Sequence, residues 1–143
     1  MLNKVGLLLL NPSLRLILGQ TQNKVSARFL MDKGKVLLLD LSKGRLGREA
    51  SNLLDGLWLI QLYLAALGRN GVPESERNPF FLLLDELQSF VSVPSFEDLL
   101  SEGRKFGVGL IGSPPVLRQL PESAIEGFAG KLRQLAFLPR QCP

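Results

Sequence analysis

Two short apolar runs, separated by a long stretch rich in Leu and Ala, dominate the pattern of this sequence. The runs Lys35–Leu41 and Pro79–Glu86 are continuous rather than alternating, which is typical of strands buried on both faces of a parallel sheet. Residues 46–67, between them, have the composition of one long helix. Strand, helix and strand in this order predict an α/β fold with an open, mostly parallel sheet flanked by helices.

Weaker patterns extend this organisation towards both ends of the chain. Residues 11–13, Asn-Pro-Ser, are typical of a helix start, and Gly19 is expected to end that short helix. Ser95–Phe106 predicts a further helix with Ser95 as its N-cap. The remaining expected elements are a surface loop at 68–78, a glycine-rich strand at 107–112, a helix at 122–128 and a strand at 132–138. A chain of 143 residues, 1–143, is expected to form a single domain.

The composition excludes several classes of chemistry. The sequence has no histidine and a single cysteine, Cys142. Ser-His-Asp and Cys-His nucleophiles, histidine-ligated metals and multi-cysteine zinc sites are therefore excluded. A disulfide within one chain is excluded as well, which favours a reducing, cytoplasmic compartment. Carboxylate, Arg, Lys, Ser and Gln side chains remain as candidates.

Charge is distributed unevenly, although the net charge is only +4. Residues 1–50 carry nine Lys and Arg against three Asp and Glu, residues 51–103 carry two against eight, and residues 104–143 carry six against two. This pattern predicts an acidic site between basic surfaces that could meet phosphates, and ordinary solvated faces are the alternative. The basic residues that flank the first strand could contact DNA phosphates or form a solvated edge: Lys33, Lys35, Lys43, Arg45 and Arg48.

No segment is expected to span a membrane. The most apolar stretch, Leu53–Leu67, is interrupted by Asp55 and Gln61 and is shorter than the ~20 residues that a bilayer requires. The run Val5–Leu10 lacks the length and the small-residue cleavage site of a signal peptide. We therefore expect a soluble domain.

The sharpest candidate site is the pair Asp85 and Glu86, which directly follows the apolar run Phe80–Leu84. Open α/β sheets bind ligands at the carboxyl ends of their strands. In P-loop NTPases an Asp at this position holds Mg²⁺, and a neighbouring ionised Glu polarises the attacking water. The alternative is a strand that ends at the surface with two solvated acids.

Three blocks of the sequence together resemble DNA-translocating ATPases of conjugation. The blocks are Asp32–Gly47, Phe81–Phe90 and Leu100–Leu110. In this order they are similar to the C-terminal half of the motor domain of a type IV secretion, or conjugative, coupling protein. The resemblance extends over about residues 11–120. It implies a partial RecA-like P-loop NTPase domain without its Walker A half, within a group that includes hexameric DNA pumps.

The resemblance implies roles for three residues. Asp85 matches the Walker B acid that holds Mg²⁺, and Glu86 matches the catalytic glutamate. Arg104 matches an arginine that reaches the nucleotide of the neighbouring subunit, where a guanidinium neutralises charge that develops on the γ-phosphate. A surface arginine near a helix C-terminus is the alternative for Arg104. The implied cofactors are ATP and Mg²⁺, and the implied partners are further motor subunits and DNA, bound without sequence specificity.

The sequence departs from the family pattern in two places. It contains no Gly-x-x-x-x-Gly-Lys-Ser/Thr phosphate-binding loop, since Gly44–Gly47 is too short and lacks the Lys-Ser/Thr ending. No phosphate-binding residue is therefore assigned. Pro114 and Pro115 stand where the family has a glutamine that senses the γ-phosphate, and Gln119 lies several residues beyond. We expect that this chain alone does not hydrolyse ATP and that it is a fragment or a split subunit.

Three interpretations follow. The first is half of a hexameric DNA-pumping ATPase, located in the cytoplasm or, through regions outside this chain, at the cytoplasmic face of the inner membrane. The second is a non-catalytic interaction module, or truncated remnant, derived from such a motor and joined to intact subunits through its Arg104 face. The third is an unrelated α/β domain in which Asp85 and Glu86 are only a strand end.

Overall fold

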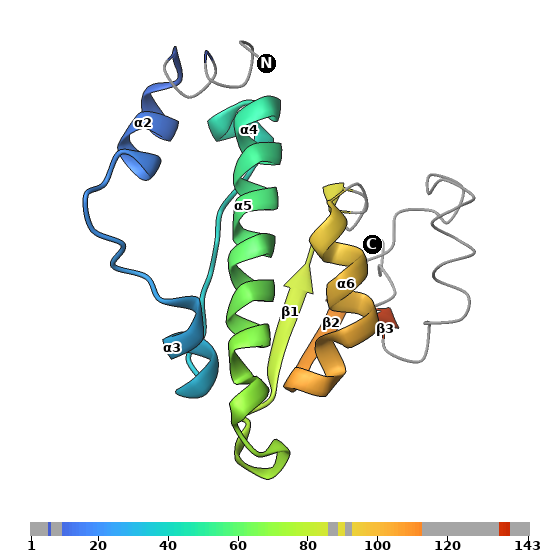
Figure 1. Cartoon of the computed structure of the whole chain (residues 1–143). Coiled ribbons are helices and arrows are strands. Elements are labelled where there is room, and N and C mark those ends of the chain that lie inside the picture. The colour runs from blue at the N-terminus through green and yellow to red at the C-terminus, as the bar shows by residue number, and fades with distance from the viewer. Residues whose placement is uncertain (1–5, 7–9, 86–88, 91–92, 113–134, 138–143) are drawn as a thin grey trace.

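In the part of the chain that the structure describes, three parallel strands form a sheet, and helices pack against it (Figure 1). The computed structural model describes residues 6, 10–85, 89–90, 93–112 and 135–137. The strands are β1 (Phe80–Leu84), β2 (Val108–Gly112) and β3 (Leu135–Phe137), in the order β1-β2-β3. Phe80 pairs with Val108 and Leu110 with Leu135. The expected α/β class and parallel sheet are confirmed, and β3 lies inside the strand expected at 132–138.

Helix α5 (Arg48–Leu67) is the longest of the described elements and lies along β1 (Figure 1). It follows the short helix α4 (Lys43–Leu46), from which Gly47 separates it. By length and composition, the stretch Arg48–Gly71 is apolar enough to cross a membrane. Its buried side chains, among them Leu59 and Leu62, pack instead against the sheet and the other helices. These contacts make one side of α5 part of the core, while Leu57, Ile60 and Leu64 on it are exposed.

Helix α6 (Pro94–Glu102) connects β1 to β2 and continues into the 3₁₀ turn η4 (Gly103–Phe106). The helix was expected to begin at Ser95 with that residue as N-cap, and this detail is wrong. Val93 is the N-cap, and its aliphatic side chain cannot accept a capping hydrogen bond. Pro94, with its fixed φ, occupies the first helical position and starts the helix one residue earlier than expected.

The first N-terminal helix behaves as the sequence predicts, whereas the second, at Ala27–Asp32, was not predicted. Helix α2 (Pro12–Leu18) is capped by Asn11, whose side chain accepts hydrogen bonds from the first turn, and Gly19 follows its last residue. Helix α3 (Ala27–Asp32) packs against α5. The expected loop 68–78 contains two 3₁₀ turns, η1 (Gly68–Gly71) and η2 (Glu74–Glu76).

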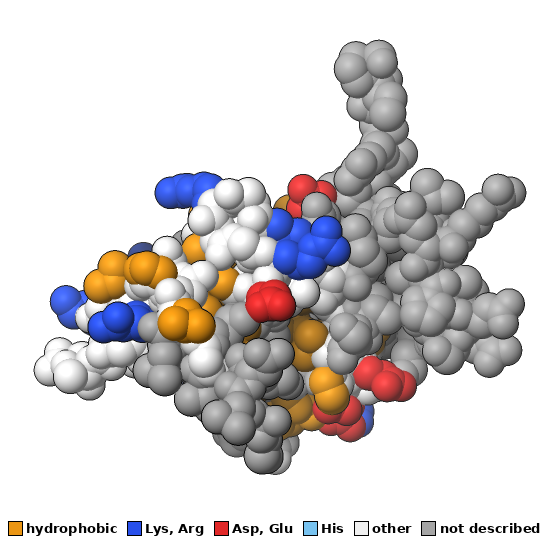
Figure 2. Space-filling model, turned by 90° about the horizontal axis from the view of Figure 1, so that it is seen from above, with side chains coloured by type: hydrophobic (Ala, Val, Ile, Leu, Met, Phe, Trp, Pro, Cys, Tyr) orange, Lys and Arg blue, Asp and Glu red, His pale blue; other side chains and the backbone are white. Residues whose placement is uncertain are grey.

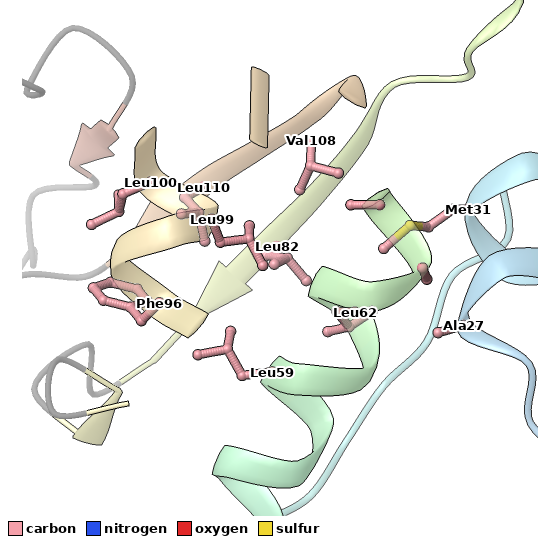
Figure 3. Packing of buried hydrophobic residues seen from close by; sticks show 12 residues of the cluster. Ala27, Met31, Leu59, Leu62, Leu82, Phe96, Leu99, Leu100, Val108 and Leu110 are labelled. Atoms are coloured by element: carbon pink, nitrogen blue, oxygen red, sulfur yellow. The ribbon is translucent and has the colours of Figure 1, made fainter. Parts of the chain in front are cut away.

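The main core lies between one face of the sheet and the helices α3, α5 and α6. In Figure 3, Leu82 of β1 and Leu110 of β2 point towards Leu59 and Leu62 of α5, while Phe96 and Leu99 approach from α6. A second, smaller cluster joins α2 to the start of α5 through Leu14, Ala50 and Leu54. The two clusters hold α5 in place at both of its ends.

The opposite face of the sheet is not covered by the described residues. Along β1 exposure alternates, so that Leu82 is buried while Phe81 and Leu83 are 58% and 68% exposed. Phe81 leans across β2 at Gly109, where a Cβ atom would come within 2.8 Å of its ring. The described connection from β1 to β2 runs through α6, whose buried side chains pack on the same face as Leu82. The expectation that this strand is buried on both faces is therefore wrong.

The first expected strand, Lys35–Leu41, is extended but is not part of the sheet. Val36 and Leu38 are 84% and 89% exposed. Among the described residues, no backbone hydrogen bond joins this segment to β1. A cavity of about 990 Å³ lies between them. The prediction of a buried strand is wrong because an apolar run becomes a strand only when a partner strand accepts and donates its hydrogen bonds.

Candidate functional site

Asp85 lies where the sequence places it, directly after the carboxyl end of β1, and its side chain is exposed. Glu86, the other member of the expected pair, lies outside the described residues. An exposed carboxylate at the end of a parallel strand is free to bind a hydrated cation. Among the residues that the structure describes, no group of three or more Asp, Glu, Cys or His side chains could hold a metal ion by itself.

The cavity beside β1 ends close to Asp85. Its walls are residues 34–44, the face of α5 that carries Ser51 and Trp58, and residues 79–85. Most of this lining is apolar, whereas polar groups gather at the carboxyl end of β1. There Lys43 Nζ lies 3.2 Å from Ser89 Oγ, which links the turn before α5 to the loop after β1. Ser51, further along, donates to the carbonyl oxygen of Leu41.

Charged side chains of both signs occupy this end of the molecule, as Figure 2 shows from above. Asp40 Oδ2 lies 2.6 Å from Arg45 Nη1, in an exposed ion pair. Hydrogen bonds from Ser42, and then from Arg45, hold the pKa of Asp40 below its usual range. Asp40 is therefore ionised near neutral pH, and it compensates one of the cations that the sequence offers for DNA phosphates.

Arg104 lies at the other end of the sheet. It is an exposed residue of the turn η4, which directly precedes β2. Strands β1 and β2 are parallel, with Phe80 opposite Val108. The five-residue length of a strand therefore separates Arg104 from Asp85, about 17 Å at 3.3 Å per residue. The structure does not bring these two candidates together within one chain.

Two further arginines hold the turn that carries Arg104. Arg69 is completely buried, and its Nη1 lies 3.0 Å from the carbonyl oxygen of Asn78 and 3.1 Å from that of Phe106. Arg77 Nε donates to the carbonyl oxygen of Val72 at 2.8 Å, and its Nη1 donates to that of Lys105. Sequence reasoning missed both residues.

A signal for this pair is nevertheless present in the sequence. Arg69 and Arg77 are the two basic residues in the otherwise acidic stretch 51–103. The only carboxylate that pairs with Arg69 among the described residues is that of Asp32, whose Oδ1 lies 3.1 Å from Arg69 Nε. Asp32 also pairs with Arg28, one helical turn away. Here an isolated arginine in the loop between a helix and a strand, Arg69, is the centre of a buried network of hydrogen bonds and an ion pair.

The basic residues that flank Lys35–Leu41 do not form one patch. Lys33 and Lys35 directly follow α3, which ends at Asp32. The carbonyl oxygen of Asp32 accepts a hydrogen bond from Asn78 Nδ2, and this bond holds the end of α3 beside the amino-terminal end of β1. The other three lie in or directly after α4, at the opposite end of α5 (Figure 1): Lys43, Arg45 and Arg48. Pro114, Pro115 and Gln119 lie outside the described residues, so the departure at the sensor glutamine stays a prediction.

Comparisons with known proteins identify the family. The family model described as the type IV secretion-system coupling protein DNA-binding domain matches residues 16–123. Searches of curated proteins and of solved structures each found no match. The matched range contains α3, α5, β1, α6 and β2, and with them Asp85 and Arg104. The chain therefore belongs to the family of type IV secretion-system coupling protein DNA-binding domains.

Proposed function

We propose that this chain is part of a hexameric, DNA-translocating ATPase of conjugative transfer or type IV secretion. In this proposal the chain supplies the Walker B side of one nucleotide site and the arginine of the next. The observation that carries the proposal is the placement of Asp85 and Arg104 at opposite ends of one parallel sheet, in a chain of the coupling-protein family. Two residues so placed can serve nucleotide chemistry only in two different sites.

Asp85 is the residue that would hold Mg²⁺ through water, and the adjacent Glu86 would hold and orient the attacking water. The exposed Asp85 carboxylate at a strand end suits this role. Bound Mg²⁺ and ATP would supply the electrophilic phosphorus and the charge neutralisation of phosphoryl transfer. Nothing in the sequence matches the loop that binds the phosphates. The proposal therefore requires that another part of the motor provides this loop.

Arg104 would act on the nucleotide of a neighbouring subunit. Its side chain is exposed, which a residue needs in order to cross an interface. A guanidinium supplied in trans stabilises the charge of the transition state and raises kcat by about 10³ to 10⁵ in enzymes that use one. The oligomer is a ring in this proposal, because a contact between two different faces of a subunit closes into a ring when its rotation allows it.

DNA is the proposed cargo, and the description of the family, which names DNA binding, supports this. Basic side chains would bind it through the phosphate backbone, which carries no sequence information. The proposed location is the cytoplasm, at the inner face of the membrane.

The decisive experiment is complementation. Intact coupling-protein subunits in which the arginine matching Arg104 is replaced by alanine retain the phosphate-binding loop but lose the trans arginine. Adding this chain should raise the rate of ATP hydrolysis by these subunits at least tenfold. The Arg104→Ala chain should restore none, whereas Arg45→Ala, which removes an exposed cation from the other end of the sheet, should act as the unchanged chain does. Equal restoration by all three chains would overturn the proposal.

A second candidate function is a non-catalytic module that joins intact subunits. The missing phosphate-binding loop favours it for the chain on its own. In that case the chain co-assembles with the intact subunits, and neither the chain nor its Arg104→Ala variant restores ATP hydrolysis.

A further inference from the structure

The turn η4 is short, and three of its features fix its shape. It is a single 3₁₀ turn between α6 and β2, closed by a hydrogen bond of 3.1 Å from the Gly107 N–H to the carbonyl oxygen of Arg104. Gly107 has a φ of 72°, which residues with a side chain rarely adopt. Gly103 is buried, and a Cβ atom there would come within 3.2 Å of the carbonyl oxygen of Val108. The direction in which Arg104 leaves the turn therefore depends on the peptide groups that follow it.

Arg69 and Arg77 bind those peptide groups. The carbonyl oxygens of Lys105 and Phe106, the two residues after Arg104, accept hydrogen bonds from Arg77 and Arg69 respectively. Both arginines also bind carbonyl oxygens of their own loop, at Asn78 and Val72. Each guanidinium thus connects the loop before β1 to the turn before β2.

Burying an arginine is a costly way to hold a fold together. Arg69 is 0% exposed, and its Nη2 is buried with no hydrogen-bond partner among the described residues. Well-packed apolar side chains of similar volume often stabilise a core as well as a buried ion pair does. A planar guanidinium offers something that they do not, namely several donors in fixed directions. This property suits the task of fixing a turn.

We propose that Arg69 and Arg77 are positioning residues for Arg104, holding its turn so that the guanidinium is presented in one orientation to the neighbouring subunit. This inference rests on the proposed trans role of Arg104. A catalytic group that is misplaced by about 1 Å loses on the order of 10²-fold in rate. A turn of four residues that begins with Gly103 and is followed by Gly107 needs such restraint, and the two arginines apply it at consecutive carbonyl groups.

Arg77 is the better residue to replace, because it is only partly buried and its variants are expected to fold. In the complementation assay, the Arg77→Met chain should lower kcat about tenfold while the KM for ATP and the amount of co-assembled chain stay unchanged. Arg77→Lys, which keeps a donor at this position, should recover part of the loss. Lys105→Met is the matched control, since it removes an exposed cation from the same turn and leaves both arginines in place. It should keep the unchanged kcat.

Hydrogen exchange of the free chain gives a second measurement that does not need the motor. The Gly107 amide, which donates to Arg104, should exchange at least tenfold faster in Arg77→Met than in Lys105→Met, while amides of α5 are unaffected.

The outcomes separate the two proposals. If Arg104→Ala restores as much ATP hydrolysis as the unchanged chain does, the trans role fails and the positioning role fails with it. If Arg104→Ala restores none but Arg77→Met retains the full kcat, only the positioning role is overturned. If Arg77→Met assembles less well with the intact subunits but keeps the unchanged kcat, the role of Arg77 is to stabilise the fold. That result would also overturn the inference.

Discussion

Asp85 and Arg104 flank two neighbouring parallel strands and lie at opposite ends of the sheet. Asp85 follows the last residue of β1, and Arg104 precedes the first residue of β2. The covalent connection between them, through α6, returns the chain to the amino-terminal edge, as every parallel crossover must. The two candidate residues, which belong to different blocks of the family resemblance, thus lie at opposite ends of the sheet. This geometry favours a site built between subunits.

For DNA binding, Lys33 and Lys35 are predicted to matter more than Lys43 and Arg45. Among the described residues no ion pair involves Lys33 or Lys35, whereas Arg45 pairs with Asp40 and Lys43 contacts Ser89. Replacing Lys33 and Lys35 by alanine should reduce the slope of log K against log salt by about 0.7 for each lost contact with single-stranded DNA. Fluorescence anisotropy with a labelled oligonucleotide at several salt concentrations measures it.

The control for that titration is the double variant Lys43→Ala, Arg45→Ala, which loses the same charge. An equal loss of slope in both double variants would contradict the prediction, because it would mean that DNA responds to total charge alone.

The core face of β1 is predicted to carry the stability of the sheet. Leu82→Ala removes a side chain that is 7% exposed and packs among α5 and α6, and should lower the free energy of unfolding by about 2–5 kcal/mol. Leu83→Ala, on the next residue, removes one that is 68% exposed and should change it by less than about 0.5 kcal/mol. Urea denaturation of both variants tests this alternation. Equal losses would mean that the outer face is also packed.

The outer face of the sheet is predicted to bind apolar surfaces. Phe81 and Leu83 are exposed side by side on this face, and Val36 and Leu38 are exposed on the neighbouring segment. Apolar surface of this kind marks interaction sites in proteins that otherwise fold normally. The isolated chain should therefore bind an apolar dye and self-associate at high concentration. Phe81→Ser with Leu83→Ser should decrease both; unchanged dye binding and sedimentation would contradict the prediction.

Arg69 is predicted to be far more important for stability than an exposed arginine. Arg69→Met leaves the carbonyl groups of Asn78 and Phe106 without their donor and should lower the free energy of unfolding by about 3 kcal/mol. Arg45→Met breaks an ion pair in which the arginine is 78% exposed, and should cost less than about 1 kcal/mol. Denaturation midpoints compare the two. A similar cost at both positions would show that the buried hydrogen bonds contribute little.

Asp40 is predicted to make the turn before α5 sensitive to acid. Hydrogen bonds from Ser42 and Arg45 lower the pKa of Asp40 in the folded chain. A lowered pKa contributes stability that is present above the pKa of the unfolded chain and is lost as the pH falls through the folded value. The Asp40→Asn variant should therefore have a slightly lower free energy of unfolding at neutral pH. Below pH ~4 its free energy of unfolding should fall less steeply with pH than that of the unchanged chain. Denaturation at a series of pH values measures the difference, and parallel curves would contradict it.

Much of the fold could be predicted from the sequence because local signals agree with the structure. Asn11 and Pro12 begin α2, the Leu-rich stretch forms α5, and the apolar residues before Asp85 form β1. These features depend on capping, on helical composition and on a short apolar run, which a single sequence displays. The family was also identifiable from three blocks in order, and its model matches residues 16–123.

The errors arose where a partner decides the outcome. Whether Lys35–Leu41 pairs in a sheet, and whether Phe81 and Leu83 are covered, depends on segments that lie beside them rather than on their own residue types. Arg69 and Arg77 stand out in the sequence as isolated cations, but their partners could not be predicted, because backbone carbonyl groups accept their hydrogen bonds and every residue has one. Glu86 and the proline pair at 114–115 lie outside the described residues.

The one-sided sheet also affects the order of events in biosynthesis. Helices α5 and α6 lie on the same side of the sheet, so β1 and β2 complete their ladder without any described element passing over Phe81 or Leu83. A nascent chain can therefore form the hydrogen bonds between β1 and β2, and the core between the sheet and α5 and α6, before anything covers the face of Phe81 and Leu83. Folding and docking are then separate steps, and the time between them is the interval in which chaperones would find the exposed face.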